Sequence, residues 1–207
     1  KLHRQIETFV VDTQAQSVRT AALVFAEALP GFEVSIDRDG QVARLTAEAL
    51  PADVGDHDAV DRIGRLTGET ATLFRWDPAT RDFRRLTTNI ETADGGRAVG
   101  TALGRDGPVF DVVRRGETFR GEATILGVDY HTVYEPVFGP DGAVVGIVYA
   151  GAEKSRFATM MDEVYAGVRQ AALLTLIGGC HVAVVALRTV IRPLTRLVGV
   201  VRRIADD

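Results

Sequence analysis

The stretch AALLTLIGGCHVAVVAL, residues 171–187, contains no charged side chain, and Arg169 and Arg188 bracket it. As a helix rising about 1.5 Å per residue it is about 26 Å long. The hydrocarbon core of a bilayer is about 30 Å thick, so residues 188–191 complete the crossing while the Arg188 side chain reaches toward the headgroups. The sequence predicts a membrane helix over residues 171–191. The alternative is a buried helix of a soluble protein, which is usually shorter.

The charges that flank this stretch predict its orientation. Five arginines follow it, whereas Arg169 alone precedes it, close to Asp162 and Glu163. Positive residues near a membrane helix stay in the cytoplasm. We therefore expect residues 1–170 to lie outside the inner membrane and residues 192–207 to lie inside. The five arginines are Arg188, Arg192, Arg196, Arg202 and Arg203.

Length and composition indicate one domain beside the membrane helix. About 170 of the 207 residues precede the apolar stretch, which is enough for one domain with its own core. The net charge is −4 and no basic face is visible outside the membrane flank, so nucleic-acid binding has no support. Cys180 is the only cysteine, which excludes an intramolecular disulfide. Because the sequence begins with Lys1 and shows no signal peptide, we expect a first membrane helix upstream, in a longer protein.

The apolar pattern before the membrane helix predicts an α+β domain. Residues 2–29 have helical periodicity and end at Pro30-Gly31. Further helices are expected at residues 59–67, 108–115 and 153–170, and the strands alternate and are separated by turns such as Asp39-Gly40 and Asp141-Gly142. These elements predict one antiparallel sheet with helices on one face and at the ends. The expected strands cover residues 32–36, 41–46, 70–76, 83–90, 119–126, 130–138 and 144–151.

An acidic cluster precedes the helix expected at residues 59–67. It contains Asp53, Asp56, His57, Asp58 and Asp61. A metal loop is one interpretation, but the alternating order of a calcium hand is missing. Carboxylates that cap the start of the helix are the favoured interpretation. The four histidines show no metal-ligand spacing, so no metal and no cofactor are predicted.

Several linked motifs follow one another within about residues 20–155: DRIGRLTGETATLFRW, DFRRLTTNI, DGGRAVGTAL and GETFRGEATILGVDYHTVYEPVFGPDGAVVGIVYAG. Together they resemble the single Cache sensor domains of bacterial chemoreceptors, of the Cache 3/Cache 2 fusion type. The segment after the membrane helix resembles the opening of a HAMP linker through Pro193-Leu194. The resemblance implies a PAS-like fold. It also implies this organisation: a sensor helix (residues 1–30), a Cache domain (31–155), a membrane-proximal helix (156–170), the membrane helix (171–191) and the HAMP start (192–207).

The same resemblance implies a function. Such domains bind small molecules, often organic acids or amino acids, and act as homodimers. They pass a helix displacement through the membrane to a HAMP unit, most often with a methyl-accepting chemotaxis region and its kinase-coupling partners downstream. Alternatives are a histidine kinase or a diguanylate cyclase as output, a membrane-anchored hydrolase, and a structural dimerisation stalk. No nucleophile elbow is found, so no catalytic residue is predicted.

Alternation along the strands selects the candidate binding residues. Arginine can clamp a carboxylate with two parallel hydrogen bonds, and hydroxyls fix the orientation of the ligand. Side chains two residues apart share a face, which groups Arg85 with Thr87, and Val145 with Ile147 and Tyr149. Thr88 is included because a one-residue bulge would exchange it with Thr87. The predicted ligand-binding residues are Arg85, Thr87, Thr88, Tyr130, Thr132, Tyr134 and Tyr149.

Overall fold

The computed structural model of this chain describes residues 2–187. It divides into two compact units, Lys1–Arg156 and Phe157–Asp207, and each is described by itself. Residues 188–191 of the predicted membrane helix and the predicted HAMP start at residues 192–207 lie outside the described residues.

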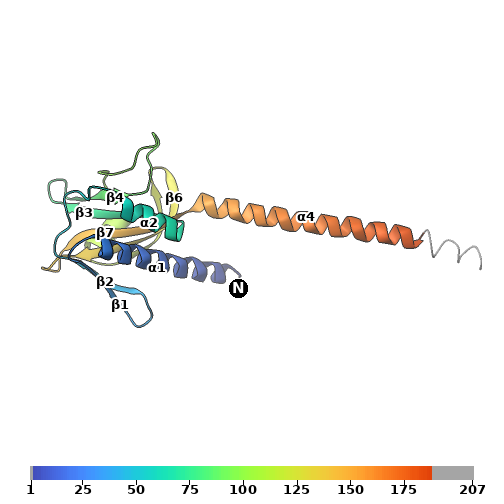
Figure 1. The fold of residues 1–207 in the computed structure, drawn as a ribbon, viewed down its shortest axis with the longest axis horizontal. Coiled ribbons are helices and arrows are strands. Elements are labelled where there is room, and N and C mark those ends of the chain that lie inside the picture. Colours follow the sequence, from blue (N-terminus) through green and yellow to red (C-terminus); the bar gives the residue numbers. More distant parts are fainter. Residues whose placement is uncertain (1, 188–207) are drawn as a thin grey trace, which may run out of the picture. The chain divides into compact units, whose positions relative to one another are not determined.

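The first unit is an α+β layer structure, as the sequence predicts (Figure 1). Its sheet has the order β1-β2-β6-β7-β3-β4, with β5 paired to β6 beside this path. The pairs are antiparallel except for a short parallel pair between β2 and β6. The strands are β1 (Phe32–Ile36), β2 (Val42–Ala47), β3 (Thr70–Asp77), β4 (Asp82–Thr88), β5 (Phe119–Ile125), β6 (Val128–Phe138) and β7 (Val144–Glu153).

Helices α1 (Leu2–Ala28) and α2 (Asp58–Thr67) cover one face of this sheet, which we call the helix face (Figure 1). The core between them is mainly aliphatic, because strand alternation turns Leu73, Val133 and Val148 toward Phe25 of α1 and Ile63 of α2. Gly68 then ends α2 with φ of 73°, a conformation that glycine adopts without strain.

The opposite face, which we call the cavity face, carries α3 (Pro108–Arg114) and a largely aromatic cluster. Phe74, Phe83 and Tyr134 alternate with the helix-face residues along their strands. The segment that connects β4 to α3 returns along the free edge of β4, where the Leu103 amide donates to the Phe83 carbonyl at 2.8 Å. This segment therefore closes the cavity face on the side of β4.

Besides a register shift between β1 and β2, two β-bulges shift the alternation that the sequence predicts. Leu73 pairs with Thr87 and Phe74 with Arg85, so Leu86 is an extra residue in β4. Val137 pairs with Gly146 and Phe138 with Val144, so Val145 is extra in β7. Val145 consequently packs on the helix face, and the prediction that it shares a face with Ile147 and Tyr149 was wrong.

The chain continues from β7 into α4 (Lys154–Ala186). Within α4, the segment Gly167–Val185 is long and apolar enough to cross a membrane, with a mean hydropathy of 1.5. None of these residues is buried, which separates the segment from the buried core helix of a soluble protein. It overlaps most of the membrane helix that the sequence predicts.

Candidate functional site

A cavity of about 530 Å³ opens on the cavity face of the first unit. One wall is the hairpin formed by β5 and the start of β6, and the other is the segment at residues 102–109, which includes the start of α3. Arg85 of β4, Tyr134 of β6 and Lys154 at the start of α4 complete the lining. Cavities of several hundred Å³ are typical of sites for small organic molecules.

Arg85 is the most buried charged residue that lines this cavity, with only 5% of the residue exposed. Its Nη1 donates to Thr101 Oγ1 at 2.7 Å and to the Ala102 carbonyl at 3.2 Å. The guanidinium carbon lies 5.0 Å from the centre of the Phe74 ring. Its Nε is buried and has no hydrogen-bond partner. One edge of the guanidinium fork thus retains unused donor capacity.

The charge of Arg85 is not balanced by an acid. Within residues 2–187, no carboxylate lies within 4.0 Å of its guanidinium nitrogens. Burial lowers the pKa of Arg85, and the neighbouring phenols of Tyr134, Tyr149 and Tyr130 oppose this only in part. An arginine nevertheless stays protonated in proteins. A buried cation without a counter-ion is costly, and an anionic ligand in the cavity would supply the missing charge.

The three predicted tyrosines lie near Arg85, but only Tyr134 lines the cavity. Tyr134 lines the cavity, and its ring centre lies 4.9 Å from that of Tyr149. The Tyr149 hydroxyl is 3.0 Å from the Thr70 hydroxyl. Burial raises the pKa of Tyr134 and that of Tyr149, so both phenols stay neutral and can donate hydrogen bonds. Tyr130 belongs to the same buried cluster.

The predicted threonines are less well placed than Tyr134 to bind a ligand in the cavity. Thr132 is fully buried and donates to the Gly121 carbonyl at 3.0 Å. The Thr88 hydroxyl lies on the cavity face but bonds the Thr72 hydroxyl at 2.7 Å. Thr87 lies on the helix face, where its hydroxyl is 2.8 Å from His57 Nδ1. The prediction that Thr87 shares a face with Arg85 was wrong, because the bulge at Leu86 exchanges it with Thr88.

Several lining residues were not predicted from the sequence. Thr101 does not line the cavity itself but accepts a hydrogen bond from Arg85 Nη1, and no role was predicted for it. Glu122 and Lys154 line the cavity and form an ion pair at 2.6 Å. Lys154 is one of only two lysines among 24 basic residues, which is a weak indication in the sequence of a special role. Its contact with Glu122 joins positions far apart in the chain, which periodicity within one strand cannot reveal.

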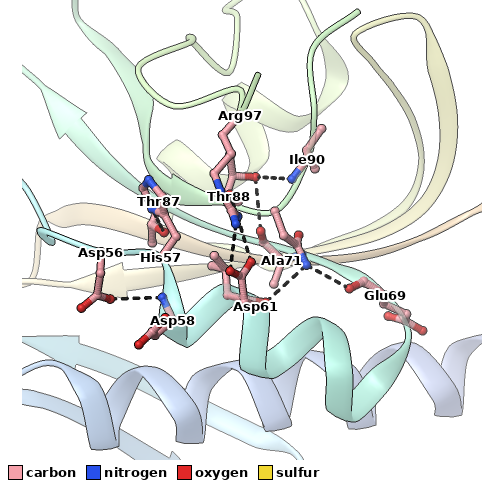
Figure 2. A network of polar contacts seen from close by, with 12 residues as sticks. Asp56, His57, Asp58, Asp61, Glu69, Ala71, Thr87, Thr88, Ile90 and Arg97 are labelled. Carbon is pink, nitrogen blue, oxygen red and sulfur yellow. Dashed lines mark hydrogen bonds and ion pairs between the residues drawn. The ribbon is translucent and has the colours of Figure 1, made fainter. Parts of the chain in front are cut away.

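The acidic cluster before α2 belongs to a separate polar network that joins α2 to β4 (Figure 2). Arg97 donates two hydrogen bonds of 2.8 Å to Asp61 and a third of 3.0 Å to the Thr88 carbonyl. Asp56 accepts a bond from the Asp58 amide at 3.1 Å. His57 occupies the N-cap position without a side-chain cap bond, so the capping prediction holds only in part. In the described part of the chain, no group of three or more metal-ligand side chains is found.

Among solved structures, the chain is similar to the periplasmic domain of RsbU from Chlamydia trachomatis, with 12% identity and a TM-score of 0.36. The likeness covers 76% of this chain and 58% of that one. Among curated proteins, no match is found.

The sequence profile of the Cache 3/Cache 2 fusion domain matches residues 1–166, which is more of the chain than the resemblance noted from the motifs. The match includes α1, the whole sheet and the start of α4. Arg85, the three tyrosines and the cavity all lie within it. The chain therefore belongs to the Cache 3/Cache 2 fusion domain family of sensor domains.

Proposed function

We propose that this chain is the ligand-sensing part of a transmembrane receptor and that it binds a small carboxylate in the cavity beside Arg85. The observation that carries the proposal is the buried guanidinium of Arg85, which has no acidic partner in residues 2–187 and has an unused Nε donor. A carboxylate accepts two parallel hydrogen bonds from such a group. Neutral Tyr134 beside it can donate another.

The membrane part of the proposal depends on α4. Its segment Gly167–Val185 is 19 residues long, and at about 1.5 Å per residue it measures about 28 Å, close to the thickness of a bilayer core. The arginines that follow it in the sequence support an outer position for residues 1–170, because positive residues near a membrane helix stay in the cytoplasm. We propose a homodimer in the inner membrane, with the candidate ligand-binding residues Arg85, Thr88, Tyr130, Thr132, Tyr134 and Tyr149 on the outer side.

Signalling in this proposal is a shift between two arrangements of the helices. A ligand transmits a signal only if it binds one arrangement more tightly than the other. The proposed output is a chemotaxis region reached through a HAMP unit. The second candidate is a histidine kinase or a diguanylate cyclase driven by the same sensor, since HAMP-type linkers serve all of these. The sequence of the output region distinguishes them, because a chemotaxis region is a long heptad hairpin.

Isothermal titration of the full chain in detergent tests the binding proposal. The probes are acetate, propionate, pyruvate and succinate, with propionamide as the neutral analogue of propionate. We expect at least one carboxylate to bind and the amide to fail. Arg85→Met should weaken binding at least about tenfold, since hydrogen bonds to charged groups contribute about 1.5–3 kcal/mol. Arg85→Lys should retain part of the affinity, because it keeps the charge and loses the fork.

The neighbouring Arg84 offers a matched control. Its side chain is 45% exposed and pairs with Asp77 away from the cavity. Arg84→Met should leave the affinity within about twofold of the parent, because an exposed charge outside the site is largely screened. Equal affinities of the parent and Arg85→Met would remove Arg85 from the site. Binding of propionamide as tight as propionate would exclude a carboxylate-selective cavity.

A further inference from the structure

The two walls of the cavity are held in different ways. The wall at residues 102–109 is tied to β4, where the Leu103 amide donates to Phe83 and the Arg85 amide donates to Thr101. The other wall, β5, pairs only with β6 in the described part of the chain. A strand paired along one edge opens more readily than a strand held on both sides. We therefore expect β5 to be the wall that adjusts when the cavity is filled.

One side-chain contact joins β5 to the helix that leads to the membrane. Glu122 of β5 accepts a hydrogen bond from Lys154 Nζ at 2.6 Å, and both residues line the cavity. Lys154 is the first residue of α4, directly after the last residue of β7. Hydrogen bonding to Lys154 lowers the pKa of Glu122, which keeps this carboxylate ionised at neutral pH.

The exposure of this pair indicates a role other than holding the fold together. The side chains of Glu122 and Lys154 are 62% and 34% exposed. Exposed ion pairs contribute little to stability, because water screens them and both long side chains lose freedom. His131 Nδ1 also lies 3.7 Å from Glu122, which gives the carboxylate a second neighbour on β6 when Lys154 moves away. The pair can therefore form and break without unfolding either wall.

We propose that the Glu122–Lys154 ion pair transmits the filling of the cavity to α4, with Glu122 and Lys154 acting as positioning residues between β5 and the membrane helix. This inference rests on the proposed function, since it needs a ligand in the cavity. A ligand bound between Arg85 and β5 displaces β5, and Glu122 moves with this strand. Lys154 then either moves with Glu122 or loses the ion pair. The first turn of α4 then takes a different position in the filled and the empty protein.

The single cysteine of the chain provides the readout. Cys180 lies in the apolar part of α4 and is exposed, so an environment-sensitive fluorophore can be attached there without introducing a new residue. The full chain is reconstituted in phosphatidylcholine nanodiscs and titrated with the carboxylate probes named above. The measured quantity is the change in fluorescence at saturating probe, which does not depend on the affinity of each variant.

We expect the parent to give a saturable fluorescence change and Glu122→Gln to reduce its amplitude at least roughly twofold, the size of effect seen along coupling networks. Lys154→Arg should retain the amplitude, and the double variant Glu122→Lys with Lys154→Glu should restore it. Glu117→Gln is the matched control, because Glu117 is an equally exposed acid that pairs with Arg115 instead. It should keep the full amplitude.

Full amplitude in Glu122→Gln, or a charge-swapped pair that restores nothing, would overturn the inference while leaving the proposed function intact. A parent that binds a probe in titration calorimetry without any change at Cys180 would overturn the inference and the proposed helix shift, and would leave only the binding of a carboxylate. Failure of every carboxylate to bind the parent would instead overturn the proposed function, and this inference with it.

Discussion

The two faces of the central sheet bury polar groups with different consequences. On the helix face, Glu69 Oε2 and Gln14 Nε2 lack partners, and burial raises the pKa of Glu69, so protonation can remove its charge. On the cavity face, Arg85 also has an unpartnered atom, but a guanidinium cannot lose its charge. The permanent charge without a counter-ion thus lies on the face that has the cavity. On the helix face, the buried acid can become neutral by taking up a proton.

The largest effect should follow from a core change on the helix face. Phe25 of α1 is 1% exposed and packs in the aliphatic cluster against the sheet. Phe25→Ala should lower the free energy of unfolding by about 3–5 kcal/mol, because it removes buried area and leaves a void. Urea unfolding followed by the fluorescence of Trp76, the only tryptophan, reports on the first unit alone. Leu23→Ala, at a residue 50% exposed on the same helix, should cost less than about 1 kcal/mol.

A smaller effect is expected where α2 is hydrogen-bonded to the sheet. Thr87→Val removes the hydroxyl that lies 2.8 Å from His57 Nδ1 and should lower the free energy of unfolding by about 1 kcal/mol. Carboxylate affinity should stay as in the parent, because Thr87 lies on the helix face. The same urea and calorimetric measurements check both parts. A loss of affinity with unchanged stability would return Thr87 to the binding site.

The pH dependence of stability should reveal the buried acid of β6. Burial raises the pKa of Glu135 above 4.5 in the folded state, although Thr118 donates to its carboxylate. The folded protein therefore binds more protons than the unfolded chain, so this contribution is complete below pH 4.5 and is lost as the pH rises through the folded pKa. In Glu135→Gln, the free energy of unfolding should therefore fall less steeply as the pH rises. Urea unfolding between pH 4 and pH 8 measures this.

A carboxylate with the opposite shift provides the control for this experiment. Arg115 lowers the pKa of the exposed Glu117, so its small contribution is present above pH 4.5 and is lost as the pH falls. Glu117→Gln should leave the decline toward high pH unchanged. Parallel pH profiles for the parent and Glu135→Gln would contradict the raised pKa of Glu135.

Substitution of Arg85, which has the largest proposed effect on binding, is expected to have the smallest effect on stability. Arg85→Met replaces an unbalanced buried charge by a shorter apolar side chain, so the free energy of unfolding should stay within about 1 kcal/mol of the parent or rise. Together with a loss of carboxylate affinity, this would separate the cavity face from the helix face by function. A strong destabilisation would assign Arg85 a structural role in holding the segment at residues 102–109.

The fold was largely predictable because its signals are local. Strand alternation, the turns at Asp39-Gly40 and Asp141-Gly142, and the apolar stretch after Arg169 each depend on neighbouring residues, and the corresponding elements are present. Arg85, Tyr134 and Tyr149 lie on one face of the sheet, although Tyr149 does not line the cavity. The roles of these residues in binding stay predictions.

What the sequence determined by itself, then, is the order of the elements, the residues that alternate along each strand and the apolar length of the membrane segment. Tertiary structure decided where Leu86 and Val145 interrupt that alternation, because a bulge adds one residue without a distinctive composition. It also decided that Arg85 has no acidic partner and that Lys154 meets Glu122. Such properties depend on which distant segments come together, and a periodic pattern within one segment contains no information about them.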